Sequence, residues 1–195
     1  GAILARGHKI KGKKINKGTC LTPEVINRLI ENNIFKITIA TPENDDLNEN
    51  EAAKLTATLI SGENLTVHPS LRGRANIYAN KTGLFKIDED QLIAMNSIDD
   101  GISIATLPPF SPVRKGQLIA TSKIIPFFLS NKTITRARET LQQKPCLNIL
   151  PYSRKNILFI ATHVSSQKPS TFKKAINSTL NRIKKLGLTI DNIIE

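Results

Sequence analysis

The sequence has few aromatic residues, few cysteines and no long hydrophobic run. Aromatic residues make up 5% of its 195 positions and tryptophan is absent, so a core must consist mainly of aliphatic side chains. Cys20 and Cys146 are too few for a disulfide framework, and we expect both to be small buried apolar residues. No apolar run approaches the length of about 18 residues that a membrane span requires. Together with the lack of a secretory signal, these absences predict a soluble, cytoplasmic protein with no membrane partner.

Common catalytic and nucleotide-binding motifs are also missing. The sequence contains no Walker loop, no Gly-x-Gly-x-x-Gly, no His-Glu-x-x-His and no Gly-x-Ser-x-Gly. Its three histidines, His8, His68 and His163, lie in different segments. We therefore expect no protein-bound metal, and the sequence nominates no catalytic residue.

Basic residues are in clear excess. Lysine and arginine number 28 against 16 acidic residues, which gives a formal net charge of +12. Residues 1–40 and 101–195 are basic, whereas residues 41–100 are acidic. This order fits an anionic partner such as a nucleotide, a phosphorylated cofactor or nucleic acid, and it equally fits segments that neutralise each other in the fold.

Hydrophobic periodicity predicts an α+β fold. We expect a β-rich mixed lead domain over residues 1–150, followed by a partial α/β unit, a strand–helix–strand, over residues 151–195. The predicted helices are 23–32, 51–60, 89–96, 132–143 and 170–186. The predicted strands are 34–40, 65–68, 72–79, 84–87, 102–107, 116–125, 147–150, 156–161 and one beginning at 188–190.

Local signals place several boundaries and surfaces. Thr22 followed by Pro23 is a favourable helix start, and Asn131 is expected to cap the helix that follows it. Residues 7–14 are rich in glycine and lysine, which predicts a solvated turn and places Lys14 away from any ligand. The apolar run 156–161 is typical of a buried parallel strand.

Three polar segments are candidates for binding an anion. In the first, Gly73 lets the backbone approach closely, Arg74 offers a bidentate guanidinium and Asn76 offers both a donor and an acceptor. In the second, Lys123 lies between apolar neighbours, so it either extends from the sheet to solvent or contacts an anion. The third is the loop between strand 156–161 and the next helix, where anions commonly bind in α/β sheets. The candidate residues of this loop are Thr162, Ser165, Lys168 and Ser170. Each segment has an ordinary reading as well: an exposed turn beside a strand for the first, a lysine that extends from the sheet for the second, and a polar loop whose Ser170 caps the helix for the third.

Four segments in this order resemble the amino-terminal part of molybdopterin-binding proteins of the molybdenum-cofactor pathway. They are Gly-Ala-Ile-Leu-Ala at 1–5, Gly-Arg-Ala-Asn at 73–76, Ile-Ala-Thr-Leu-Pro at 104–108 and Ala-Thr-x-Lys-Ile-Ile-Pro-Phe at 120–127. Residues 156–195 are similar to the first strand–loop–helix of the molybdopterin-binding domain. The Gly-Asp-Glu-type loop of molybdopterin molybdotransferases is absent.

The resemblance implies a molybdenum-cofactor biosynthesis protein that binds molybdopterin or a related phosphorylated ligand. Arg74, Lys123 and Lys168 would contact the anion, and Gly73 and Asn76 would shape its approach. Longer members of the family act in molybdenum insertion or nucleotidyl transfer. We expect no turnover from these 195 residues alone, because only one strand-exit loop of an α/β site is present.

The alternative is a non-enzymatic basic module that binds nucleic acid or a protein partner. Five basic residues of the predicted helix 170–186 favour it: Lys173, Lys174, Arg182, Lys184 and Lys185. Nucleic acid is less expected than a phosphorylated pterin or nucleotide, because no nucleic-acid-binding signature is present and stacking aromatics are scarce. Assembly into a homo-oligomer stays open at this point.

Overall fold

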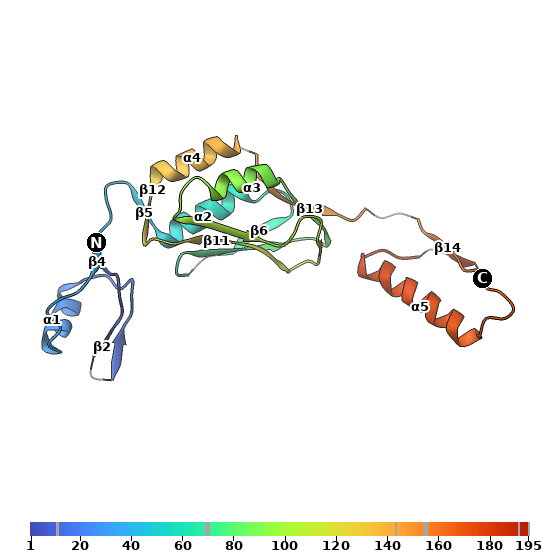
Figure 1. The fold of residues 1–195 in the computed structure, drawn as a ribbon, viewed down its shortest axis with the longest axis horizontal. Coiled ribbons are helices and arrows are strands. Elements are labelled where there is room, and N and C mark those ends of the chain that lie inside the picture. Colours follow the sequence, from blue (N-terminus) through green and yellow to red (C-terminus); the bar gives the residue numbers. More distant parts are fainter. Residues whose placement is uncertain (11, 69–70, 143, 154–155, 191, 195) are drawn as a thin grey trace.

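The computed structural model describes residues 1–195 except 11, 69–70, 143, 154–155, 191 and 195. The fold is α+β, as the periodicity predicts. Figure 1 shows a central unit with a smaller N-terminal unit at one end and a C-terminal unit at the other. We use these three names for residues 1–40, 46–151 and 158–194.

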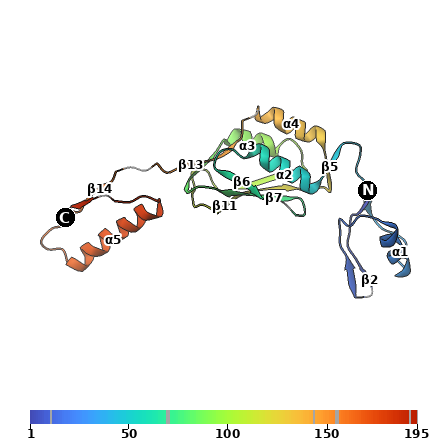
Figure 2. The ribbon, with the colours of Figure 1, turned by 180° about the vertical axis from the view of Figure 1, so that it is seen from behind.

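The central unit is built on a four-stranded antiparallel sheet. Its strands in spatial order are β6 (Leu65–His68), β7 (Arg74–Ala79), β11 (Leu118–Ile124) and β9 (Ile102–Thr106). The helices of the unit are α2 (Glu49–Ile60), α3 (Glu89–Asn96) and α4 (Asn131–Leu141). Figures 1 and 2 show them together on one side of the sheet, where α2 packs against β7 and β11.

Two smaller sheets complete the central unit. The first contains β10 (Pro112–Val113), β8 (Gly83–Ile87) and β13 (Leu147–Pro151), in that order. The second pairs β5 (Asp46–Asn48) with β12 (Phe128–Ser130), so that the segment before α2 lies beside the segment before α4. The main core is a cluster of aliphatic side chains around the fully buried Phe85 and Met95, as the scarcity of aromatics requires.

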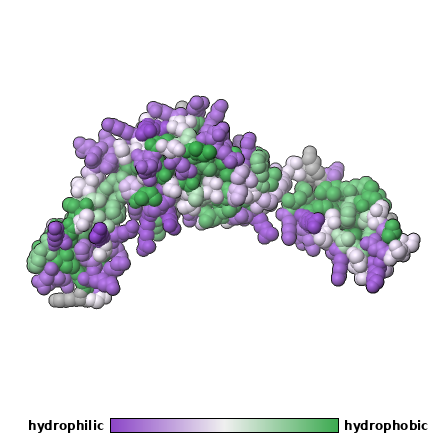
Figure 3. Space-filling model, viewed as in Figure 1, coloured by the Kyte–Doolittle hydropathy of each residue, from purple (hydrophilic) through white to green (hydrophobic). Residues whose placement is uncertain are grey.

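Strand register decides which side chains of β11 are buried. Ser122 lies opposite Ala75 and Ile104, and all three are buried on the helix-covered face. Lys123 lies opposite Arg74 on β7 and Ser103 on β9, and these side chains occupy the other face because neighbouring residues alternate. In Figure 3, hydrophilic side chains follow the lower edge of the central unit, on the side away from the helices.

The N-terminal unit has its own small core. It contains a β2–β3 hairpin (His8–Ile10 and Lys13–Ile15), α1 (Pro23–Glu31) and the pairing of β1 (Ile3–Leu4) with β4 (Ile39–Ala40). Its buried cluster consists of Leu4, Ile10, Ile15 and Leu29, separate from the main core. The expected start of α1 is confirmed: the Thr22 hydroxyl accepts a hydrogen bond from the backbone N–H of Val25, and Pro23 is the first helical residue.

The C-terminal unit is the expected strand–helix–strand. β14 (Leu158–Ile160) and β15 (Asn192–Ile194) pair in parallel, and α5 (Pro169–Lys185) connects them. The predicted burial of this strand is wrong, because Leu158 is 56% and Ile160 is 59% exposed. One helix covers only one face of a two-stranded sheet, so the residues on its other face stay open.

Several local predictions also need correction. The alternating segment 34–40 forms a strand only at Ile39–Ala40, because the ladder with β1 covers these two residues alone, although the Thr38 carbonyl still accepts from the Ala5 N–H and Ile34 and Ile37 pack on the small core. The turn predicted over residues 7–14 is a β-hairpin whose residue 11 lies outside the described residues. The cap of α4 is Ser130, not Asn131, and the helix ends at Leu141, so the predicted end at residue 143 lies outside the described part.

The described part of the chain contains no helix long and apolar enough to cross a membrane. The domain boundary at residues 150 and 151 stays a prediction. It coincides with the end of β13 at Pro151, after which the chain leaves the central unit.

Candidate functional site

A tight backbone junction at Arg72 and Gly73 organises one end of the four-stranded sheet. Both residues have positive φ, 56° at Arg72 and 66° at Gly73, before the chain enters β7. The Gly73 N–H donates to the Asn50 side-chain oxygen on α2 at 2.9 Å, and the Gly73 carbonyl accepts from the Ile124 N–H at 2.7 Å. A methyl group on Gly73 would lie 2.7 Å from the Ile124 carbonyl oxygen. The glycine is therefore required where the loop, α2 and β11 meet.

Lys123 is bound to this junction. Its Nζ donates a hydrogen bond of 2.7 Å to the Arg72 carbonyl oxygen, which leaves two N–H groups of the ammonium for other partners. Burial lowers the pKa of Lys123 from its ordinary value; Glu49 opposes that shift, and the nearby charges of Arg74 and Lys17 add to it. The ammonium thus lies near one carboxylate, Glu49, and two cations, Arg74 and Lys17, and burial still makes its charged form less favourable than in water.

Arg74 and Asn76 lie on the same uncovered face of the sheet as Lys123. Arg74 is the direct cross-strand neighbour of Lys123 and is exposed to solvent. The Asn76 side-chain oxygen accepts a 2.9 Å hydrogen bond from the Thr121 hydroxyl on β11, so its amide is held in place beside them. Four of the eight candidate binding residues, Gly73, Arg74, Asn76 and Lys123, are therefore brought together.

A cleft of about 310 Å³ opens beside this junction, between the N-terminal and central units. The N-terminal unit contributes Gly7, Lys14, Asn16 and Lys17, and the central unit contributes Glu49, Arg72 and Phe127. The Lys17 ammonium lies 5.6 Å from the centre of the Phe127 ring, which is a cation–π contact. Lys14 is expected to lie away from any ligand, and that stays a prediction, although hairpin pairing places this exposed residue in the wall of the cleft.

The first turn of α2 does not offer free N–H groups to the cleft. The Glu49 N–H donates to the Phe127 carbonyl at 2.9 Å, and the N–H groups of Asn50 and Glu51 donate to the Asn48 side chain at 3.0 Å each. An anion in the cleft would therefore be held by lysine and arginine side chains rather than by this helix N-terminus.

The other four candidates lie in the C-terminal unit. Thr162, Ser165, Lys168 and Ser170 are all exposed, in the loop between β14 and α5 and in the first turn of α5. Ser170 does not cap the helix, since Lys168 occupies the capping position without a side-chain hydrogen bond. Figure 1 places this unit at the opposite end of the central unit from the cleft. The structure thus separates the eight predicted binding residues into two groups of four.

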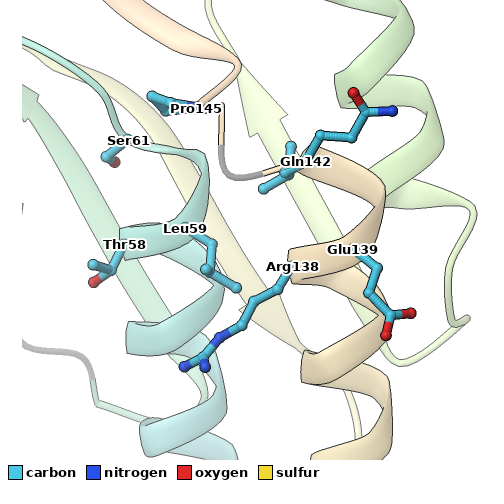
Figure 4. A pocket seen from close by; sticks show the side chains of 8 residues that line it. Thr58, Leu59, Ser61, Arg138, Glu139, Gln142 and Pro145 are labelled. Carbon is cyan, nitrogen blue, oxygen red and sulfur yellow. The ribbon is translucent and has the colours of Figure 1, made fainter.

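A larger cavity, of about 710 Å³, lies between the ends of α2 and α4. Figure 4 shows Leu59 and Arg138 extending between the two helices, whereas Glu139 and Gln142 point away from α2. None of the predicted binding residues lines this cavity. Among the described residues that line this cavity, Arg138 is the only basic one, and Glu139 is acidic. The cavity therefore has fewer positive charges for binding a phosphate than the cleft has.

Metal-ligating and nucleophilic groups are scattered in the described residues. No three side chains of His, Cys, Asp or Glu gather there in a way that could hold a metal ion. Cys146 is buried as predicted, and burial raises the pKa of its thiol to about 12, so it stays protonated at neutral pH. The predicted burial of Cys20 is wrong, because this residue is exposed.

Comparison of the chain with protein-family models, with curated proteins and with solved structures finds no match in any of the three. The observations on the chain itself define it as an α+β protein with a basic cleft lined by two of its units.

Sequence reasoning did not identify Lys17, Glu49 or Phe127 as parts of a site. Lys17 is one of several lysines near the N-terminus, and Glu49 lies in the acidic part of the sequence, residues 41–100. No local sequence pattern marks Lys17 or Glu49, because they line the same cleft only once the N-terminal and central units are folded. The cross-strand position of Arg74 and Lys123 follows from the β7–β11 register, which the sequence does not specify either.

Proposed function

We propose that this protein binds a phosphorylated ligand of the molybdopterin type in the cleft between its N-terminal and central units, as a component of molybdenum-cofactor biosynthesis. The observation that carries the proposal is that Lys17 and Arg72 line the cleft, while Lys123 and its cross-strand neighbour Arg74 lie beside it at the Gly73 junction. The pathway comes from the resemblance of four segments, two of which, 73–76 and 120–127, meet in this place.

The residues present fit such a ligand. Lysine and arginine side chains bind phosphate esters through charge-assisted hydrogen bonds, and Lys123 retains two N–H groups for that purpose. The cleft volume of about 310 Å³ is within the range of small-molecule sites, and Phe127 provides an apolar wall for a ring. The proposal concerns binding; it assigns no chemical step to these residues.

Calorimetric titration with a pterin that carries a phosphate ester tests the proposal. We expect one ligand per chain, and we expect Lys123→Ala and Arg74→Ala each to weaken binding about tenfold, the lower end of the range for hydrogen bonds to charged groups because both side chains are partly solvated. Lys115→Ala is the matched control. Lys115 is exposed and precedes β11, at the end of the strand remote from Lys123 and the Gly73 junction.

The proposal fails if the three variants and the unmodified protein bind the pterin equally. The alternative, a basic module for nucleic acid, predicts a different pattern. Its binding would fall steeply with salt, depend little on Lys123, and fall when the basic residues of α5 are replaced. No residue of α5 is buried, so those side chains are accessible to such a partner.

A further inference from the structure

Glu49 places a carboxylate in the wall of a cleft that is otherwise basic. It is the first residue of α2, it is half-buried, and its β-carbon would lie 3.2 Å from a methyl group on Gly73. Apart from its electrostatic interaction with Lys123, its carboxylate forms no hydrogen bond or ion pair with the described residues. No side chain or backbone group of the described residues donates to either of its two oxygens.

A site for phosphate alone gains nothing from this carboxylate. Glu49 would repel a phosphate that approaches Lys123, because like charges at short distance oppose each other. The same carboxylate is favourable if the ligand is an anion at one end and carries N–H donors at the other. A carboxylate accepts two such donors side by side, one on each oxygen.

We propose that Glu49 is a specificity-determining residue of the cleft: it accepts adjacent N–H groups at the ring end of a phosphorylated heterocycle, while Lys123 and its cationic neighbours bind the phosphate. The ligand class is a phosphate ester of a ring with a 2-amino-4-oxopyrimidine edge, which presents a ring N–H beside an amino group. Phe127 also lines the cleft and gives it an aromatic side chain that such a ring can contact. This inference rests on the proposed function and specifies which ring the bound phosphate ester carries.

Guanosine and inosine 5′-monophosphate are the probes, because they differ by the amino group alone. We expect the unmodified protein to bind the guanosine nucleotide about tenfold more tightly, since removing one partner from a charged acceptor is costly. In Glu49→Gln this preference should disappear, and inorganic pyrophosphate should bind more tightly than it does to the unmodified protein. Weaker binding of the guanosine nucleotide together with tighter binding of pyrophosphate indicates a role in specificity. A general effect on folding would weaken the binding of both.

Glu89→Gln is the matched control. Glu89 is also the first residue of a helix, α3, and it also follows a side-chain cap, but it is exposed and does not line the cleft. This variant should keep both the nucleotide preference and the pyrophosphate affinity. A Glu49→Gln protein that still prefers the guanosine nucleotide, or that changes its affinity for all three ligands by the same factor, overturns the inference.

The outcomes also separate this inference from the proposed function. If pyrophosphate binds and depends on Lys123 but the nucleotide preference does not depend on Glu49, the inference alone is wrong. If the phosphorylated pterin, the nucleotides and pyrophosphate all fail to bind, both the proposed function and the inference are wrong.

Discussion

Lys123 shows how a single residue acquires properties that its type does not give it. In an isolated strand it would be an ordinary exposed lysine. Here its ammonium is half-buried, donates to the Arg72 carbonyl and shares its surroundings with Arg74 and Lys17. Burial is the largest of the effects that lower its pKa, so its charge is lost at a lower pH than that of a solvated lysine.

Binding of pyrophosphate is therefore expected to weaken as pH rises through the lowered pKa of Lys123. Below that pKa the ammonium is charged and contributes fully; above it the attraction is lost. Lys123→Arg should keep its affinity to higher pH, because a guanidinium stays protonated. Titrations between about pH 7 and pH 10 measure the difference, and parallel curves for the two proteins would assign the pH dependence to another group.

The same shift has the opposite sign for folding. Because the native pKa lies below the unfolded one, the unfolded chain binds more protons between the two values, and the free energy of unfolding rises with pH across that window. At neutral pH the charged, partly buried Lys123 therefore lowers the free energy of unfolding slightly.

At the scale of the element, the three-stranded sheet depends on close backbone contact. Gly83 pairs with Pro151 on β13 and with Val113 on β10. A methyl group at Gly83 would overlap the carbonyl oxygen of Leu150 and lie 2.9 Å from the Pro151 α-carbon. These contacts are backbone atoms, which cannot rotate away as a side chain can.

Gly83→Ala is expected to lower the free energy of unfolding by about 1–3 kcal/mol, the usual cost of overpacking, because β13 must move away from β8. Thermal unfolding followed by circular dichroism measures the loss. Gly116→Ala is the comparison: no atom lies within 4 Å of a methyl group there, and the cost is limited to backbone strain at φ 83°. Equal destabilisation by the two substitutions would mean that strand contact is not the cause.

At the scale of the whole molecule, the cleft lies between two units with separate cores. The N-terminal unit buries four aliphatic side chains, and the central unit buries a much larger cluster. The small core of the N-terminal unit contributes little to the free energy of unfolding by itself. We therefore expect the cleft wall formed by the N-terminal unit to unfold locally more easily than the wall formed by the central unit.

Leu29→Ala should unfold the N-terminal unit locally while the central unit stays folded. Leu29 is 2% exposed and belongs to the small core, and losing a buried leucine costs about 2–5 kcal/mol. Hydrogen exchange should show faster exchange in α1 and the β2–β3 hairpin and unchanged protection in β7 and β11. Ile77→Ala, in the main core, should instead reduce protection across the central unit; a uniform loss of protection in Leu29→Ala would show that the two cores unfold together.

Much of the fold was predictable because its signals are local. The helix at Glu89–Asn96 and the strand at Leu65–His68 have the predicted bounds, and Thr22 caps the first helix as expected. These features depend on side-chain periodicity and on capping groups a few residues away. The segment 34–40 shows the limit: its alternation is genuine, but a strand also needs a neighbour, and only Ile39–Ala40 has one.

What the sequence by itself determined is the α+β class and most elements; the residues that it nominates for binding an anion stay a prediction. Only the tertiary structure decided which of those residues meet. Gly73, Arg74, Asn76 and Lys123 converge because β7 and β11 pair in one particular register, whereas Thr162, Ser165, Lys168 and Ser170 fold into another unit. Lys17 and Glu49 join the first group through contacts between residues far apart in the chain, and no local pattern encodes such contacts.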